Sequence, residues 1–240
     1  MSFHRLIARR IADGVGEQLF PGRITVENAV ITKIERGDFA PELACDCFYD
    51  EQYIAAPGFI DAHGHSDISL LAMPEAQGKC AQGIAFEISG NCGLSPFPLT
   101  DRNRQHLQEL YRQYHIELDW SDLTSYQQRL RRQTGNLELL PLVGHNTLRA
   151  AVAGYEKKQL SAGEKAAMQT LLEQALQQGA LGLSSGLLYT PGCFADRSEI
   201  IDLLKIVARY NKIYTVHLRS EGNDLAAALS EPSLRPGHPD

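Results

Sequence analysis

The stretch "APGFIDAHGHSD" (residues 56–67) joins an apolar run to two histidines, His63 and His65, which are one residue apart. In an extended segment, side chains two residues apart point to the same side, so both imidazoles can face one ion. Gly64 between them removes a side chain at a point where the backbone must come close to a neighbour. We interpret this stretch as the end of a buried strand that presents two metal ligands.

Apolar runs of the same kind recur along the chain and alternate with amphipathic helical patterns. The runs are typical of strands buried on both faces, and they cover residues 53–61, 83–89, 137–144, 180–188 and 212–218. Helical periodicity covers residues 101–114, 161–179 and 196–210. This alternation predicts an α/β fold with a parallel sheet of about five strand–helix units. A doubly wound sheet could be complete at this length, whereas a (β/α)₈ barrel usually needs about 250 residues.

The first 54 residues follow a different pattern. "RITVENAVITKIE" (23–35) alternates apolar and polar residues, and turn-forming residues precede it. These features indicate short β segments that form part of a small β-rich module.

Composition and charge limit the partners and the cellular location that the chain can have. The 240 residues carry a formal net charge of −6, which argues against nucleic acid or an anionic membrane as a partner. No apolar stretch is long enough to span a bilayer, and "MSFHRLIARR" lacks the apolar region of a secretory signal. The five cysteines form no regular framework, so we expect a reducing, cytoplasmic location.

Metal-binding residue types also follow the other predicted strands. Cys92 in "GNCG" (90–93) follows the second strand, His145 follows the third, and His217 lies in the fifth. In parallel α/β folds, active sites assemble at the carboxyl ends of strands. Imidazole and thiolate together suit Zn²⁺. Taken singly, Cys92 and His217 could be ordinary core residues, and His145 could simply hydrogen-bond a loop.

Two further cysteines and two aspartates are weaker candidates for functional residues. We interpret Cys45 and Cys47 as structural, and the absence of any CxxC argues against a redox function. Asp61 precedes the histidines and is expected to orient them rather than to bind the metal. Neither Asp61 nor Asp67 obviously supplies a catalytic carboxylate.

Five motifs together resemble the successive motifs of the N-acyl-D-amino-acid deacylases (D-aminoacylases), which belong to the amidohydrolase superfamily. They are "APGFIDAHGHSD", "EISGNCGLSP", "VGHNTLR", "GALGLSSGLLYTPG" and "VHLRSEG". The resemblance runs from about residue 5 to about residue 229. It implies a metal-dependent hydrolase with a TIM-type (β/α)₈ barrel, incomplete here, beside a composite β-sandwich. Residues 1–54 would be the N-terminal part of the sandwich, residues 55–229 the partial barrel and residues 230–240 an irregular tail.

The resemblance also implies roles for individual residues. His63 and His65 match two metal ligands, Cys92 matches a cysteine that binds zinc, and His217 matches a third histidine ligand. Tyr189 matches a tyrosine that lines the substrate pocket.

Three further residues are left without an assigned role. Arg219 and Glu221 match an "HxRxE" pattern, and His145 lies in one of the five motifs.

The implied reaction is zinc-dependent hydrolysis of an N-acyl-D-amino acid to a carboxylate and a free D-amino acid, by attack of metal-bound hydroxide. The resemblance implies that the general acid/base aspartate, on the last barrel strand, and a fourth histidine, from the sixth strand, lie beyond residue 240. In "SEPSLRPGHPD" (230–240) three prolines stop a helix, and no apolar strand follows. We therefore expect a C-terminally truncated member. The metal number, the oligomeric state and the acyl and side-chain preferences stay open.

Two alternatives also stay open. The chain could be a catalytically inactive remnant that at most binds zinc or pairs with a partner chain. It could also be a relative that hydrolyses other linear or cyclic amides. A cyclic-amide hydrolase would need a carbamylated lysine at a strand end, and neither Lys157 nor Lys158 supplies one.

Overall fold

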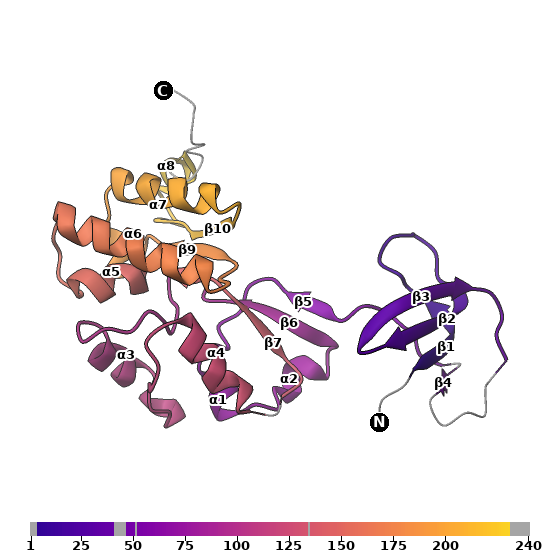
Figure 1. Ribbon diagram of the computed structural model, residues 1–240. Helices are drawn as coiled ribbons and strands as arrows, with labels where there is room; N and C mark the ends of the chain where they lie inside the picture. Colours follow the sequence, from indigo (N-terminus) through magenta and orange to yellow (C-terminus); the bar gives the residue numbers. More distant parts are fainter. Residues whose placement is uncertain (1–3, 41–46, 51, 134, 231–240) are drawn as a thin grey trace. The chain divides into compact units, whose positions relative to one another are not determined.

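The computed structural model describes residues 4–40, 47–50, 52–133 and 135–230. The chain divides into two compact units, Met1–Gly58 and Phe59–Asp240 (Figure 1). Cys45 and nearly all of the tail predicted at 230–240 lie outside the described residues.

The first unit contains a four-stranded sheet with the order β3-β2-β1-β4. Its strands are β1 (Arg5–Ile11), β2 (Phe20–Glu27), β3 (Val30–Arg36) and β4 (Cys47–Asp50). β1 pairs antiparallel with β2 and parallel with β4, and β2 pairs antiparallel with β3.

A tight hairpin joins β2 to β3. Asn28 and Ala29 at its tip have φ angles of 50° and 62°, the left-handed pair that matches the right-handed twist of hairpin strands. Ile11 and Phe20 are buried together in a small core on this sheet. The β segments predicted at 23–35 are therefore confirmed as one hairpin.

The second unit contains parallel strands whose order in space follows their order in the chain. They are β5 (Phe59–Asp61), β6 (Ile84–Ser89), β7 (Glu138–Pro141), β8 (Val143–Gly144), β9 (Gly182–Gly186) and β10 (Ile213–His217). They form the sheets β5-β6-β7 and β8-β9-β10, and only Leu142 separates β7 from β8. All pairings are parallel, so the predicted α/β fold is confirmed.

Helices follow the strands. They are α1 (Ser69–Ala72), α2 (Gln77–Cys80), α3 (Arg104–Leu110), α4 (Leu123–Arg131), α5 (His145–Ala153), α6 (Ala162–Gln177), α7 (Arg197–Arg209) and α8 (Leu225–Ser230). Short 3₁₀ turns occur at Arg112–Tyr114 and Gly192–Phe194. Within the described ranges, no helix combines the length and the apolar character needed to cross a bilayer.

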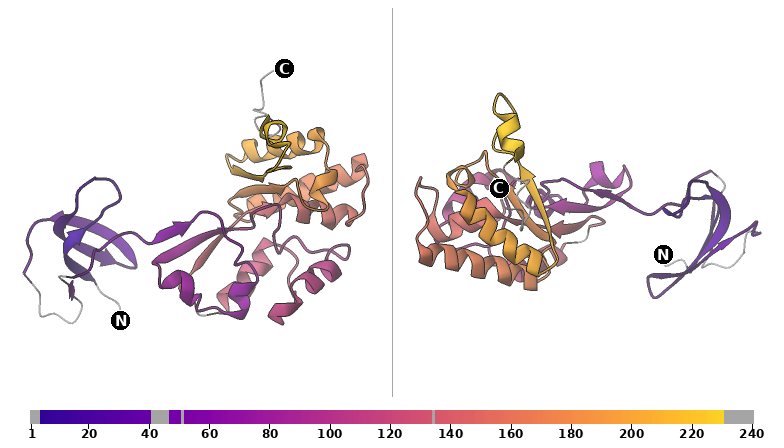
Figure 2. Two further views of the ribbon diagram at one scale, coloured as in Figure 1. Left: turned by 180° about the vertical axis from the view of Figure 1, so that it is seen from behind. Right: turned by 90° about the horizontal axis from the view of Figure 1, so that it is seen from above.

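The helices predicted at 161–179 and 196–210 are confirmed as α6 and α7, and the one predicted at 101–114 is shorter. Ser161 and Glu164 form the capping box expected at the start of α6. The helices α5, α6 and α7 pack against one another beside β8–β10 (Figures 1 and 2). Their apolar faces meet in the main core of this unit, which includes Leu148, Leu172 and Leu203.

The prediction that the run at 53–61 is buried on both faces is wrong. β5 is only three residues long, and Phe59 and Ile60 are 61% and 59% exposed. The reason is its position, because β5 lies at the edge of its sheet and pairs only with β6 among the described strands. The central strand β9, by contrast, is buried throughout.

Candidate metal centre

Three side chains from two neighbouring strand ends converge beyond β5 and β6. His63, His65 and Cys92 each offer one donor atom, and these atoms lie within 4.8 Å of one another. Nε2 of His63 lies 3.3 Å from Sγ of Cys92. In a tetrahedral zinc site with bonds of about 2.1 and 2.3 Å, a nitrogen and a sulfur donor are about 3.6 Å apart. The donor set and its spacing therefore fit one zinc ion.

The loop that carries Cys92 adopts an unusual backbone conformation. Gly90, Cys92 and Gly93 all have positive φ angles, of 73°, 56° and 74°. A side chain at either glycine would overlap its neighbours, since an added Cβ would meet Leu142 at position 90 and Asn146 at position 93. For a residue with a Cβ, the left-handed conformation costs about 1–2 kcal/mol. The fold thus holds Cys92 in a strained conformation that places its thiol beside His63.

Burial and charge set the protonation of these donors. Burial, then the negative charge of Glu221, raises the pKa of the Cys92 thiol. Burial, then the charge of His63, lowers the pKa of His65 below its usual value. The His65 imidazole is therefore biased towards its neutral, ligating form, whereas Cys92 must release a proton when it binds a metal.

Asp61 and Asp67 differ in their surroundings. Asp61 Oδ1 accepts a hydrogen bond from the backbone N–H of His63 at 3.1 Å, so Asp61 contacts the backbone of this histidine. Lys79, then this N–H, holds the pKa of Asp61 below its usual value. Asp67 is buried, and burial raises the pKa of its carboxyl group to about 7.

His217 lies beside the three-donor group rather than within it. It is the last residue of β10, and its Nε2 is 3.4 Å from Oη of Tyr189 and 3.6 Å from Oε1 of Glu221. When protonated, its imidazolium contributes to the lowered pKa of His65. The structure thus brings three of the four predicted metal ligands together and places His217 and Tyr189 as a pair next to them.

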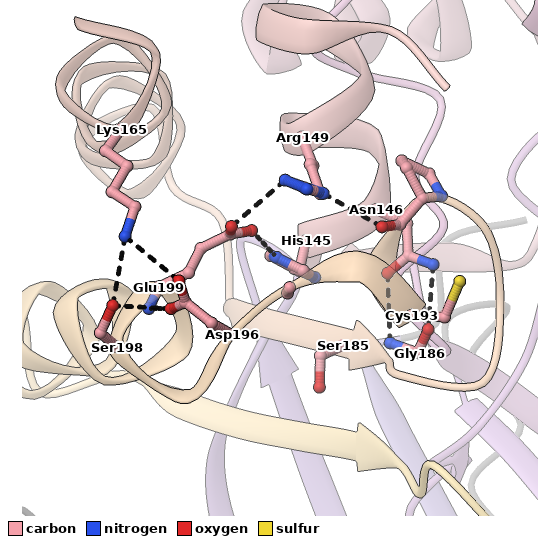
Figure 3. Close-up of polar contacts among 12 residues, drawn as sticks. His145, Asn146, Arg149, Lys165, Ser185, Gly186, Cys193, Asp196, Ser198 and Glu199 are labelled. Carbon is pink, nitrogen blue, oxygen red and sulfur yellow. Dashed lines mark hydrogen bonds and ion pairs between the residues drawn. The ribbon is translucent and has the colours of Figure 1, made fainter. Parts of the chain in front are cut away.

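His145 belongs to a separate buried network, shown in Figure 3. Its Nε2 lies 2.8 Å from Oε1 of Glu199, and Arg149 donates from Nη1 to Oε2 of the same carboxylate at 3.2 Å. All three side chains are almost fully buried. His145 is the first residue of α5 and not part of a loop, and its Nε2 contacts a carboxylate.

The loop that carries Tyr189 is held by side chains that donate to its carbonyl groups. Two of the donors, Asn146 and Arg149, come from α5 (Figure 3). The third is Arg219, which follows β10. The acceptors are the carbonyl oxygens of Gly186, Leu187, Tyr189, Pro191 and Cys193, at 3.0–3.3 Å. Arg219, to which the sequence assigned no role, is thus an anchor of this loop.

Sequence reasoning missed two charged residues next to the candidate site. Glu87 lies in β6 and is fully buried, and Lys79 lies in α2 and contacts Glu87 and Asp61. Glu87 could have been noticed, because it is a lone charge within the apolar run 83–89. Lys79 lies in a short polar segment, and no sequence pattern singles it out.

Comparisons with known proteins give relatives of one kind, although no family model matches the chain. An N-acyl-D-aspartate deacylase of Alcaligenes xylosoxydans xylosoxydans is 35% identical over 225 residues, which are 93% of this chain and 45% of that protein. A D-aminoacylase of the same organism is 36% identical over 181 residues, which are 74% of this chain and 37% of that protein.

A solved structure agrees with these relatives. The N-acyl-D-glutamate deacylase of Bordetella bronchiseptica, complexed with zinc and a phosphonate inhibitor, superposes with a TM-score of 0.84 at 32% identity. The match covers 97% of this chain and 48% of that one. The chain therefore spans about half the length of the relatives it matches, and it belongs to the family of the N-acyl-D-amino-acid deacylases.

Proposed function

We propose that this chain binds zinc through His63, His65 and Cys92 and acts in the hydrolysis of the amide bond of N-acyl-D-amino acids. The observation that carries the proposal is the convergence of these three donor atoms within 4.8 Å. Zinc bound there supplies a Lewis acid that polarises a carbonyl group and lowers the pKa of a water molecule.

The chain's own residues would hold the ion and the substrate. His65 is biased towards a neutral imidazole by its lowered pKa, and Cys92 contributes the thiol. From the family resemblance we assign His217 as a further ligand and Tyr189 as a substrate contact. The two rings are neighbours, with centroids 4.8 Å apart. The anchored loop keeps Tyr189 next to this histidine.

We also propose that residues 55–229 form part of a (β/α)₈ barrel and that residues 1–54 form part of a β-sandwich. Supporting the first point, the strands of the second unit are parallel and follow the chain order. Barrels are built in this way, whereas doubly wound sheets reverse their strand order at a switch point. A cytoplasmic location is proposed as well, and the four described cysteines, Cys47, Cys80, Cys92 and Cys193, are free thiols.

Metal analysis of the purified chain tests the proposed zinc site. We expect about one zinc per chain for the wild type and much less for Cys92→Ser, because this variant lacks the thiolate that completes the group of three converging donors. Cys47→Ser, which removes a thiol of the other unit, is the matched control and should bind zinc like the wild type. Zinc retained by Cys92→Ser, or absent from the wild type, would contradict the assignment.

Turnover is measured separately on N-acetyl-D-amino acids. Release of the free D-amino acid by the zinc-loaded chain, and its loss in Cys92→Ser, is the expected result. A chain that binds zinc but releases no D-amino acid would support the alternative of an inactive, metal-binding protein.

A further inference from the structure

We propose that Lys79 is a positioning residue that fixes the segment carrying His63 and His65. Lys79 contacts two carboxylates, those of Asp61 and Glu87, and we call these three residues the lysine bridge. The inference rests on the proposed metal site and assigns the bridge the task of holding that site ready for the ion.

One end of the histidine segment is tied to the bridge through Asp61. The ammonium of Lys79 lies 2.5 Å from Oδ2 of Asp61. The other oxygen, Oδ1, accepts the backbone N–H of His63 at 3.1 Å. The orientation of this carboxylate therefore sets the backbone position of the first histidine.

The other end is tied through Glu87. The same ammonium lies 2.7 Å from Oε2 of Glu87, and Oε1 accepts the backbone N–H of Ser66 at 2.8 Å. Ser66 directly follows His65. Both ends of the segment 63–66 are thus connected to a single positive charge.

The middle of the segment is pressed against β6. The N–H of Gly64 donates to the carbonyl oxygen of Ile88 at 3.0 Å. A Cβ at position 64 would overlap the carboxyl group of Glu87, so only glycine allows this approach. As a result Gly64 is buried, whereas His63 and His65 on either side of it are exposed.

Because Glu87 is buried, the position of its carboxylate depends on the positive charge of Lys79. Its side chain is fully buried, and the ammonium of Lys79, 2.7 Å from Oε2, is the positive charge that the structure places against it. A buried carboxylate without a countercharge is costly, and it shifts its position or takes up a proton. Removal of Lys79 would therefore release Asp61 and Glu87 together and loosen both ends of the segment.

Binding of Co²⁺, followed by the visible and thiolate charge-transfer absorption of the complex, tests the positioning role without an activity assay. Loss of groups that orient metal ligands typically weakens metal affinity about 10–100-fold, and we expect this loss for Lys79→Met. Lys79→Arg, which keeps the charge, should recover part of the affinity. Lys165→Met is the matched control, because Lys165 is 26% exposed against 27% for Lys79 and also faces a carboxylate, that of Asp196.

A double variant separates positioning from folding. Lys79→Met with Glu87→Gln leaves no buried charge unpaired, and the glutamine oxygen can still accept the N–H of Ser66. We expect this variant to unfold at a urea concentration close to that of the wild type and still to bind Co²⁺ weakly, because Asp61 has lost its link to the bridge.

The outcomes are distinct. Wild-type affinity and absorption in both Lys79→Met and the double variant would overturn the proposal. If no Lys79 variant folds, the lysine bridge is needed for folding rather than for positioning, and the proposal is likewise overturned. If the wild type itself binds neither Co²⁺ nor zinc, the proposed metal site fails first, and the positioning role fails with it.

Discussion

Two groups of residues follow parallel strands of the second unit, and they differ in what their side chains contact. His63 and His65 are exposed and meet Cys92, so their donor atoms can bind an ion. His145 follows β8 in the same way, but it is buried and contacts Glu199 (Figure 3). A position at a strand end therefore identifies a candidate ligand, and the partner of the side chain decides its role.

The backbones of the two groups differ as well. Cys92 has a left-handed conformation between two glycines with the same property, whereas His145 begins a regular helix. Strained conformations persist where the surrounding structure enforces them, and they are concentrated at functional sites. The contrast is consistent with a binding role for the first group and a structural role for the second.

The largest expected effect comes from breaking the buried network. Glu199→Gln leaves Arg149 without its carboxylate partner in the protein interior, which should lower the free energy of unfolding by about 3–5 kcal/mol. Urea denaturation measures this change. Glu109→Gln, at an exposed pair with Arg112, is the control and should change stability by less than about 1 kcal/mol. If both variants lose the same free energy of unfolding, the buried network contributes no more to stability than an exposed ion pair.

A pair of histidine variants tests the comparison directly. His65→Ala should weaken Co²⁺ binding about 100-fold with little change in stability, because the residue is an exposed ligand. His145→Ala should lower the free energy of unfolding by about 2 kcal/mol and leave Co²⁺ affinity unchanged, because Glu199 loses a buried partner. Metal titration and urea denaturation of both variants measure this, and the opposite pattern would reverse the assigned roles.

The strain at Cys92 predicts a smaller effect. Cys92→Gly and Cys92→Ala both remove the thiol, but only alanine keeps a Cβ in the left-handed conformation. The glycine variant should therefore be more stable than the alanine variant by about 1 kcal/mol. Urea denaturation without metal measures the difference, and an alanine variant of equal or greater stability would show that no strain is stored there.

The smallest effect concerns Glu164, a half-buried carboxylate that pairs with Lys158, whereas Glu199 is fully buried. Lys158, then the backbone N–H of Ser161, lowers the pKa of Glu164 from 4.5 to about 2. A lowered pKa in the folded state stabilises the protein above the unfolded value of 4.5, and this contribution is lost as the pH falls from 4.5 towards 2. The urea midpoint of the wild type should therefore fall more between pH 6 and pH 3 than that of Glu164→Gln. Equal falls of the two urea midpoints would show that ionisable groups other than Glu164 cause the loss of stability in acid.

Local sequence patterns predicted much of the fold. Helix α6 was evident because Ser161 and Glu164 form its cap and its apolar residues recur along one face. Helix α5 was missed because it begins at Gly144 without a side-chain cap and because its polar residues are buried like its apolar ones, so no solvent-facing side marks it. Helix α4 could have been found from its capping box at Asp122 and Ser125.

The candidate site was predictable in its residue types but not in its geometry. The spacing of His63 and His65 and the strand-end position of Cys92 indicated ligands for one ion. The exposure of β5 was not predictable, because an apolar run has the same sequence pattern in a central strand and in an edge strand. Nor was the lysine bridge, because Lys79 meets Asp61 and Glu87 only once α2 has packed near β6.

By itself the sequence determined the parallel α/β arrangement and the types of side chain at each strand end, since both follow from local patterns of apolar and polar residues. Only the tertiary structure decided that His63 meets Cys92, 29 residues away, and that His145 meets Glu199, 54 residues away. Contacts over such separations depend on how strands and helices pack, and no local sequence pattern predicts them.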